Sequence, residues 1–414
     1  MDEAPVTDFW WTDMAEQPSD YGPGGFHPVL IGDVFSTIPT TGHPRYKVIA
    51  KLGRGASATV WLASDLLVQN CVALKFSAAR LTGQNKEVSI LKRLSSRNTE
   101  DSQGAHTIRL LDYFEVRGPN GVHEVIVTEV VLGWNEMRYS AVSLPPVRKV
   151  TAELALGLAH IHNCDIVHGD LHVGNIGFRM NGFDQVDEFQ VLQAIDAVTD
   201  QFCYPVISEN LEMNVEGLPK YIVSSHNKIG WMAALCDVDR LTALIMDFGE
   251  APSKPNIMFY LQPPELLLNL QPLSQAGDIW AFGCTVSELV LRWPLFANIL
   301  NEKDLLKRMV ATLGPLPREW QLDNAPAWLN LDDDDAQLIT AGQKDQGYML
   351  DRVALSWFRS VTEIPPSAQV IEDTQALFSM LSALLQFEPK SRPPIDEVVR
   401  HPWLRQFTAR NTPV

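Results

Sequence analysis

The segment of residues 166–178 restricts what this chain can fold into more than any other, because it crowds polar side chains between two apolar runs. It reads IVHGDLHVGNIGF. A structural turn needs only residues such as Gly, Pro, Asn and Asp. Several polar side chains placed so close together are typical of loops that perform chemistry. We therefore interpret this segment as a catalytic loop. Its polar residues are His168, Asp170, His172 and Asn175.

Length and charge set broad limits on function. With 414 residues, of which 46% are hydrophobic, the chain can form one large two-lobed domain or two ordinary domains with full cores. The formal net charge of -17 argues against direct binding to nucleic acid or to a membrane surface. The same charge would suit a basic partner or substrate, although a solvated acidic surface is the commoner explanation.

The cysteines and the first residues bear on location. The chain has 5 cysteines, far apart and without a CxxC pair, which favours neither a disulfide framework nor a zinc site and fits a reducing compartment. The stretch MDEAPVTDFWWTDM is acidic and lacks the pattern of a signal peptide, and no apolar run approaches the length needed to span a bilayer. We therefore expect a cytoplasmic or nuclear protein.

The hydrophobic pattern predicts an arm followed by two lobes. Residues 1–44 are rich in Pro, Gly, Asp and Thr without a sustained period, which indicates an extended arm. Residues 45–132 hold short runs rich in Val, Leu and Ile and one helical stretch, which predicts a five-stranded antiparallel β lobe with one helix. Residues 133–414 carry apolar residues at helical spacing, with an insertion at about 180–240. The predicted fold class is α+β.

A glycine-containing turn opens the β lobe. In KLGRGASATVWLA, Gly53 and Gly55 lack a Cβ, so the backbone N–H groups could approach phosphate oxygens closely. The signal is weak on its own, because a two-glycine hairpin is more often only a turn and the third glycine of a GxGxxG pattern is here Ala58.

A lysine and a glutamate follow this turn at suitable spacing. Lys75 ends the apolar run VALK, and a lysine inside an apolar strand needs an anionic partner. The phosphates of a nucleotide, together with the carboxylate of Glu87 on the following helix, would supply one. An unpaired, exposed lysine is the alternative.

Three oxygen-bearing side chains predict a reaction centre. Asp170 would accept or orient the proton of an attacking hydroxyl. Asn175, through its amide oxygen, and Asp247, in LIMDFGEA, would bind the magnesium that bridges nucleotide phosphates, because carboxylate and amide oxygens suit a hard cation. His168, beside the apolar DIV, is more often a packed structural residue than a proton shuttle in such a position.

The motifs occur in the order of the eukaryotic protein kinase motifs, and the resemblance covers nearly the whole chain. GGFHPVLIGDVF and the strand after it, together with a spacer before DFG, resemble more narrowly the serine/arginine-rich-protein kinases, as a fungal-type member. This resemblance implies a bilobal protein kinase fold and an ATP-dependent protein serine/threonine kinase. The other matching segments are PPE at 263–265, GDIWAFGC at 277–284, MVATLGPLPREW at 309–320, RP at 392–393 and HPWL at 401–404.

The resemblance also implies roles by position. Thr128 would be the gatekeeper, and the backbone of Glu129 and Val131 would meet the adenine edge. A buried pair of Glu265 with Arg392 would be architectural, and Asp278 would brace the catalytic loop. The catalytic residues would be Asp170, Asn175, Lys75, Glu87 and His172. The residues that bind ATP would be Gly53, Arg54, Gly55, Ala56, Ser57, Val60, Ala73, Lys75, Thr128, Glu129, Val131 and Asp247, and the Mg²⁺ ligands would be Asn175 and Asp247.

Two positions depart from the family pattern. Gly169 replaces the arginine that normally receives an activation-segment phosphate, and Ser253 is the only hydroxyl besides Tyr260 in the segment 247–265, so we expect an enzyme that needs no activation-loop phosphorylation. His172 stands where serine/threonine kinases have a lysine. A neutral imidazole would supply less charge to the transferring phosphoryl group, so turnover would be slow unless the ring is protonated.

Two other functions stay open at this point. The loop HGDLHVGN also resembles that of aminoglycoside and choline phosphotransferases, which act on small molecules, but these do not account for GDIWAFGC, LGPLPREW or HPWL. A pseudokinase scaffold would account for His172 and Ala58. It would not account for the retained set of Lys75, Glu87, Asp170, Asn175 and Asp247.

Acidic residues bear on the substrate. Glu302, Asp304 and the run from Asp332 to Asp335 could together attract an arginine-rich peptide, although the run taken alone suits a solvated loop. We expect a protein substrate rich in Arg and Ser and a monomeric enzyme.

Overall fold

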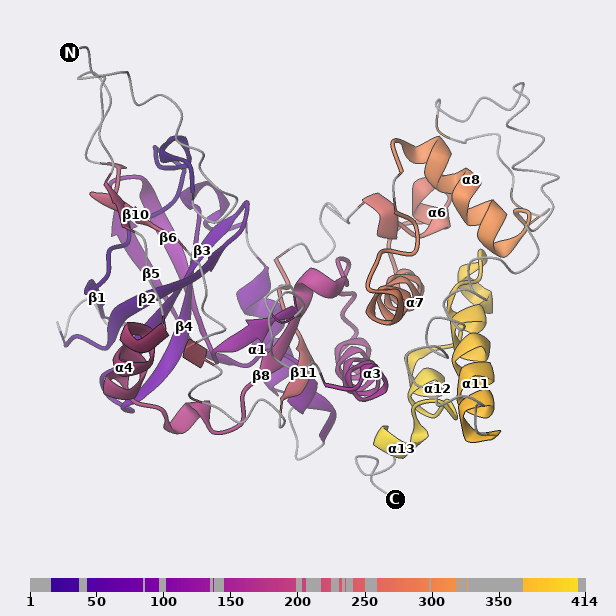
Figure 1. Ribbon diagram of the computed structural model, residues 1–414. Helices are drawn as coiled ribbons and strands as arrows, with labels where there is room; N and C mark the ends of the chain where they lie inside the picture. The colour runs from indigo at the N-terminus through magenta and orange to yellow at the C-terminus, as the bar shows by residue number, and fades with distance from the viewer. Residues whose placement is uncertain are drawn as a thin grey trace, which may run out of the picture.

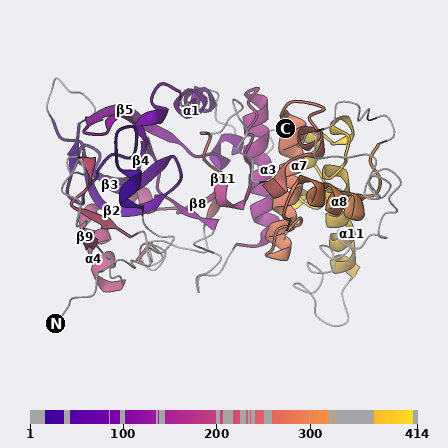
Figure 2. The ribbon, with the colours of Figure 1, turned by 90° about the horizontal axis from the view of Figure 1, so that it is seen from above.

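The chain forms two lobes, shown in Figure 1 as a computed structural model. The structure describes residues 16–36, 43–84, 86–96, 102–134, 137, 145–198, 203–205, 217–224, 231–232, 235, 241–249, 259–297, 299–317, 320, 326 and 368–408. Seen from above in Figure 2, the strands lie at one side, the long helices at the other, and β8, β11 and α3 between them. This is the α+β, bilobal architecture that the sequence predicts.

The small lobe is an antiparallel sheet of six strands in the order β1-β2-β3-β4-β6-β5. The sequence predicts five; the sixth is β1, a short strand of the N-terminal arm, in which Val34 pairs with Lys47 of β2. The arm therefore adds to the sheet instead of only lying beside it. The elements of this lobe are β1 (Val34–Phe35), β2 (Tyr46–Arg54), β3 (Ala58–Asp65), β4 (Asn70–Ser77), α1 (Glu87–Ser96), β5 (Leu110–Gly118) and β6 (Gly121–Thr128).

Both faces of this sheet are buried, which explains why its strands read as nearly continuous apolar runs. On the inner face, Leu62 and Ile126 pack in one core with Leu91 of α1. On the outer face, Trp61 and Leu74 pack in a second core. Successive side chains of a strand point to opposite faces, so adjacent residues of β3 enter different cores.

The arm and the insertion cover the outer face together. Phe26 of the arm packs with Ile222 of β10 (Tyr221–Val223), which pairs with β9 (Cys203–Pro205). The side-chain amide of Asn120 donates to the carbonyl oxygens of Phe26 and Gly217, at 2.8 Å each. Helix α4 (Glu188–Val198) instead packs in the inner core through Val191, and its Glu188 forms an ion pair with Lys47 of β2 at 2.6 Å. A segment that leaves the large lobe thus returns to the far side of the small lobe.

A buried ion pair fixes the start of the described arm. Lys51 of β2 pairs with Glu16, and both side chains are 0% exposed. The ammonium also lies 5.0 Å from the ring centroid of Trp61. Burial lowers the pKa of Lys51, and the Glu16 carboxylate opposes that shift. A charge removed from water in this way depends on its partner.

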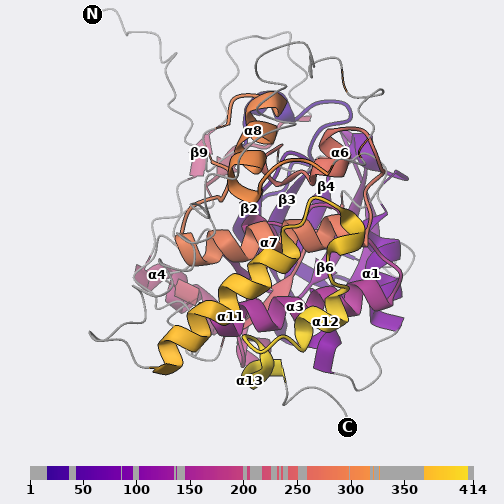
Figure 3. The same cartoon turned by 90° about the vertical axis from the view of Figure 1, so that its right-hand side faces the viewer.

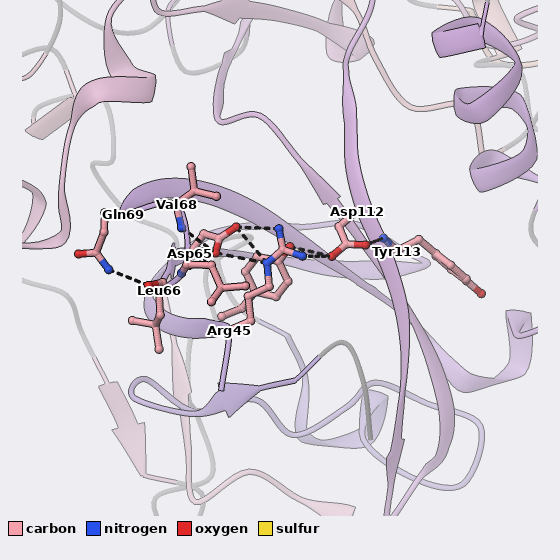
Figure 4. A network of polar contacts seen from close by, with 9 residues as sticks. Arg45, Asp65, Leu66, Val68, Gln69, Asp112 and Tyr113 are labelled. Carbon is pink, nitrogen blue, oxygen red and sulfur yellow. Dashed lines mark hydrogen bonds and ion pairs between the residues drawn. The ribbon is translucent and has the colours of Figure 1, made fainter. Parts of the chain in front are cut away.

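A polar network joins three strands at the opposite end of the sheet from the glycine turn (Figure 4). The guanidinium of Arg45 donates to Asp112 at 2.7 Å and to Asp65 at 3.0 Å. The other oxygen of Asp65 accepts the N–H of Leu67 at 3.0 Å, which closes the turn between β3 and β4. One cation therefore positions a hairpin turn and the start of β5.

The large lobe is built around α7, which is buried along almost its whole length. Helix α11 packs on α7, and α12 and α13 pack on α3, as the side view in Figure 3 also shows. A three-stranded sheet in the order β11-β8-β7 lies on the side facing the small lobe. The elements are β7 (Val131–Gly133), α3 (Val147–Asn163), β8 (Ile176–Arg179), β11 (Thr242–Ile245), α6 (Pro264–Leu267), α7 (Gln275–Leu291), α8 (Glu302–Leu313), α11 (Ala368–Leu384), α12 (Ile395–Val399) and α13 (Arg405–Thr408).

None of the helices within the described ranges is long and apolar enough to cross a membrane. Cys71, Cys164 and Cys284 are buried, and Cys203 is exposed.

The buried pair of Glu16 with Lys51 gives a stability prediction. Glu16→Ala leaves an uncompensated buried ammonium, and we expect it to lower the free energy of unfolding by about 3–5 kcal/mol. The double variant Glu16→Leu with Lys51→Met removes both charges and should recover most of that loss. Urea unfolding followed by tryptophan fluorescence measures both.

The matched control is Lys47→Ala at the exposed pair with Glu188, where Lys47 is 43% exposed and the expected loss is below about 1 kcal/mol. Equal losses for Glu16→Ala and Lys47→Ala would contradict the assigned role of the buried pair.

Candidate active site

The catalytic loop lies between α3 and β8, and the segment with Asp247 follows β11. The two strands pair antiparallel, and the N–H of Met246 extends the pairing by donating to the carbonyl oxygen of Asn175 at 3.0 Å. The sheet register therefore brings together two segments that are far apart in the sequence.

Asp278 of α7 holds the backbone of the catalytic loop. It is 1% exposed, and its two carboxylate oxygens accept the N–H groups of His168 at 2.8 Å and of Gly169 at 2.9 Å. The ring of His162 donates to the same carboxylate at 2.9 Å. Gly169 has a φ of 82°, in the left-handed region, where the arginine of the family pattern would be strained.

His168 is packed and links the two segments. The ring is fully buried, lies 5.0 Å from the ring of Phe248, and contacts the carbonyl oxygen of Met246 at 3.3 Å through Nε2. Its Nδ1 accepts the N–H of Asp170 at 3.2 Å. Burial lowers the pKa of His168, which keeps the ring neutral. It acts as a structural joint, as its apolar neighbours in the sequence indicate.

The predicted catalytic residues of this loop converge on Asp170. The side-chain amide of Asn175 donates to the Asp170 carbonyl oxygen at 2.8 Å and to its Oδ2 at 3.3 Å. The Nε2 of His172 lies 3.5 Å from the same Oδ2. The Oδ1 of Asp170 is buried and has no hydrogen-bond partner in the described part of the chain. One carboxylate oxygen is thus engaged and the other is available.

Lys75 joins three elements. Its ammonium on β4 donates to both carboxylate oxygens of Glu87 on α1, at 3.0 Å and 2.8 Å, and to Oδ1 of Asp247 at 2.9 Å. Asp247 has a φ of 63°, a left-handed conformation that is uncommon for a residue with a side chain. The predicted partner of the strand lysine is therefore present, and Asp247 is a second one.

The charges of this cluster shift one another. Burial alone would lower the pKa of Lys75, but the carboxylates of Asp247 and Glu87 outweigh it and raise the pKa. The Lys75 ammonium lowers the pKa of Asp247 to about 2. Burial raises the pKa of Glu87, and the nearby Asp247 carboxylate adds to this shift, although the Lys75 ammonium and a backbone hydrogen bond from Phe248 oppose it. Lys75 and Asp247 therefore stay charged over the whole neutral range.

The glycine turn and the apolar side chains of the predicted nucleotide site lie on the adjacent strands. The N–H of Gly55 donates to the carbonyl oxygen of Ala58 at 2.8 Å, which closes the hairpin between β2 and β3. Val60 lies opposite Lys75 in the register, and Val60 and Ala73 both pack on the inner face. The hairpin that joins these strands contains Gly53, Arg54, Gly55, Ala56 and Ser57.

The connection between the lobes runs from Thr128, at the end of β6, to Val131, at the start of β7. The hydroxyl of Thr128 donates to the Glu129 carbonyl oxygen at 3.2 Å. The Glu129 carboxylate, 7% exposed, accepts from Arg109 at 3.0 Å and from Arg179 at 2.7 Å. Burial would raise the pKa of Glu129, but the two guanidinium groups outweigh it and lower the pKa.

Sequence reasoning missed Arg109 and Arg179, which fix the hinge through Glu129. Arg109 interrupts the apolar run IRLL and Arg179 ends the run IGFR, and a charge at such a place is the signal that could have indicated a buried partner. The partner itself is not readable from the sequence, because it lies on a third segment.

Arg392 and Glu265 form the buried pair that the resemblance implies. The guanidinium donates in parallel to both carboxylate oxygens, at 2.8 Å and 2.7 Å, and both side chains are almost fully buried. Ser253 and the run from Asp332 to Asp335 lie outside the described residues.

Two lobes joined by a hinge, a lysine of the small lobe bonded to an aspartate of the large lobe, and a second aspartate on the loop beside them are the features of a protein kinase. The protein kinase domain family matches residues 46–196 and 245–404, so the chain belongs to this family. The match is interrupted between residues 196 and 245.

The relatives that this chain matches are named as protein kinases. The chain is 34% identical to serine/threonine-protein kinase SKY1 of Saccharomyces cerevisiae over 44% of this chain and 25% of that protein. It is 26% identical to serine/threonine-protein kinase SRPK of Physarum polycephalum over 94% of this chain and 91% of that protein. It is 36% identical to SRSF protein kinase 3 of Homo sapiens over 39% of this chain and 29% of that protein.

These findings confirm the predicted family and fold. The relatives are serine/threonine protein kinases, which is the class that the resemblance implied. They favour neither the pseudokinase nor the small-molecule phosphotransferase. The aligned region spans only about a quarter of SKY1 and of SRSF protein kinase 3, but nine-tenths of the Physarum kinase.

The shifted pKa of Asp247 gives a pH prediction. In the folded state this carboxylate stays ionised down to about pH 2, whereas in the unfolded chain it takes up a proton near 3.8. The unfolded state therefore binds more protons between these values, so the stabilisation is complete above about pH 4 and is lost as the pH falls towards 2. We expect the unfolding free energies of wild type and Asp247→Asn to differ most at neutral pH and to converge in acid.

Urea unfolding at stepped pH measures this difference. The control is Asp165→Asn, since Asp165 is 80% exposed in its pair with Arg93 and should give almost no difference at any pH. A pH-independent difference for Asp247→Asn would show that the charge of Asp247 is not what stabilises the fold.

Proposed function

We propose that this chain is a protein serine/threonine kinase that transfers the γ-phosphoryl group of ATP to hydroxyls of proteins. The observation that carries the proposal is the meeting of Lys75, Glu87 and Asp247 in one charged cluster, with Met246 bonded to the backbone of the loop that holds Asp170. The charged cluster suits a triphosphate, and the loop suits a hydroxyl nucleophile.

The donor set fits ATP with magnesium. The carboxylate of Asp247 is 48% exposed, and Lys75 occupies only its Oδ1. Asn175 turns its amide nitrogen to Asp170, which leaves its amide oxygen for a cation. Asp247 and Asn175 would hold Mg²⁺, since both offer the hard oxygen atoms this ion prefers. When bound, the ion neutralises charge on the phosphates.

The chain's own residues would position the reactants. Lys75 would bind the α and β phosphates, and the hinge backbone at Glu129 and Val131 would meet the adenine edge. The free Oδ1 of Asp170 would accept the hydrogen of the substrate hydroxyl and align it for direct in-line displacement. Catalysis would then come mainly from orientation and from charges already in place.

Loss of a charged member of the site should slow phosphoryl transfer strongly. We expect Asp247→Ala and Asp170→Asn each to lower kcat for phosphorylation of an Arg-Ser peptide by roughly 10²- to 10³-fold or more. Incorporation of radiolabelled phosphate from ATP measures this. Lys47→Ala, a charge removal near the start of β2 at the pair with Glu188, should leave kcat unchanged.

The same assay separates the alternatives. Transfer by wild type to choline or an aminoglycoside instead of the peptide would support the small-molecule phosphotransferase, and no transfer to any acceptor would support the pseudokinase. Either result would overturn the proposed activity.

We propose that the substrate has serines flanked by arginines. We also propose that the enzyme acts as a monomer and is located in the cytoplasm or the nucleus. Support for the substrate comes from the net charge of -17, from Glu302 and Asp304 in the first turn of α8, and from the name of the relative SRSF protein kinase 3. Opposite charge on peptide and enzyme would raise the rate of encounter.

A basic substrate predicts a salt effect. Replacing the arginines of the peptide by glutamine should raise KM by about tenfold or more, and raising ionic strength from about 0.1 M to 1 M should raise KM for the arginine peptide alone, because salt screens exposed charges. Peptide kinetics at fixed ATP measure both. An equal KM for the two peptides at low salt would rule out the basic-substrate proposal and leave the kinase activity untouched.

A further inference from the structure

The hinge residues Glu129 and Val131 are both held by one residue of the large lobe, Arg179, which ends β8. Its backbone pairs with Val131 in the register of β7 with β8. Its guanidinium binds the Glu129 carboxylate through two nitrogens: Nη2 donates to Oε1 at 2.7 Å, and Nε donates to Oε2. The backbone and the side chain of the same residue therefore hold the two positions that would meet the adenine edge.

The same guanidinium also binds the segment that leads into β5. Its Nη1 donates to the carbonyl oxygen of Ala105, and its Nη2 donates to the carbonyl oxygen of Thr107 at 3.3 Å. The N–H of Ile108 donates to the carbonyl oxygen of Ile245 in β11 at 2.9 Å, so this segment is fixed to the large lobe. The guanidinium thus joins the hinge to backbone that is itself bonded to β11.

The second guanidinium on Glu129 comes from the end of that segment. Arg109 donates to the carboxylate through its backbone N–H and its Nη2, at 3.0 Å each. The next residue, Leu110, begins β5 and pairs with Thr128 of β6 in the small lobe. Glu129 and Arg109 are therefore bound to the large lobe, while the residues beside them belong to the small lobe. Motion of one lobe relative to the other would bend the chain at these two junctions and leave the adenine-binding backbone in place.

We propose that Arg179 is a positioning residue for the nucleotide, which holds the backbone of Glu129 and Val131 in the direction that adenine requires. This rests on the proposed kinase function. Arg179 acts through the hinge, because its side chain is 16% exposed and all three guanidinium nitrogens are directed to Glu129 and to the segment before β5. A guanidinium suits this role, because its planar fork fixes the direction of each bond as well as its length.

The test compares wild type, Arg179→Met and Arg179→Lys by calorimetric titration with ATP and magnesium and by peptide kinetics. Methionine is uncharged, and lysine keeps the charge without the fork. We expect Arg179→Met to raise Kd and KM for ATP about tenfold while kcat stays within about threefold of wild type, because the lost contacts act on nucleotide binding and not on the transferring group. Arg179→Lys should lie between the two. An ATP affinity unchanged in Arg179→Met would overturn the proposal.

Arg148 offers a matched control for a merely structural loss. It joins α3 to α11 by donating to Asp373 at 2.9 Å, and its side chain is 13% exposed. Arg148→Met should lower the free energy of unfolding, as Arg179→Met does, because each leaves a carboxylate with fewer partners. Only Arg179→Met should weaken ATP binding and raise hydrogen exchange of the hinge amides. Equal weakening of ATP binding by both variants would trace the effect to general stability and overturn the proposal.

A double-mutant cycle tests whether Arg179 acts through Glu129. Glu129→Gln keeps the hinge backbone and removes the charge, so the double variant with Arg179→Met should bind ATP about as weakly as either single variant. Fully additive losses would overturn the proposed route. If wild type binds ATP but phosphorylates no acceptor, the proposed function fails while the Kd values still decide the role of Arg179. A wild type that binds no ATP would overturn both.

Discussion

One ammonium group holds the reaction centre together. Lys75 comes from a strand of the small lobe, Glu87 from its helix, and Asp247 from the segment after a strand of the large lobe, and all three meet within hydrogen-bonding distance. A lysine in so apolar a strand would be costly without these carboxylates. The same attraction that stabilises the lysine therefore sets the position of α1 and links the two lobes.

The catalytic loop depends on a comparable arrangement of fixed charges. Asp278, buried in the central helix α7, aligns two backbone N–H groups of the loop, and the loop in turn directs Asp170. Groups that are already oriented need no reorganisation when a phosphoryl group moves, which is the main source of catalysis in such sites. The pairing of β8 with β11 supplies the remaining geometry, since it bonds Met246, the residue before Asp247, to the backbone of Asn175.

The sequence was most informative where one residue conflicts with its neighbours. Lys75 in an apolar strand, and four polar side chains in one short loop, indicated partners and chemistry before any contact was known. The spacing of residues in the sequence did not indicate two sets of ion pairs, because each set joins segments that approach one another only when whole lobes pack. These are Glu129 with Arg109 and Arg179, and Glu16 with Lys51. The sixth strand was missed for the same reason: two residues of the arm carry no periodic signal, and only the exposed edge of β2 gives them a partner.

By itself the sequence determined the two lobes, the family and the residue types of the reaction centre, because these follow from local periodicity and from motifs a few residues long. Only the tertiary structure decided that the arm and the insertion together cover the outer face of the small lobe and that two arginines hold the hinge. The physical reason is that hydrogen bonds and ion pairs depend on distance and direction, and between distant segments these arise only when the cores have packed.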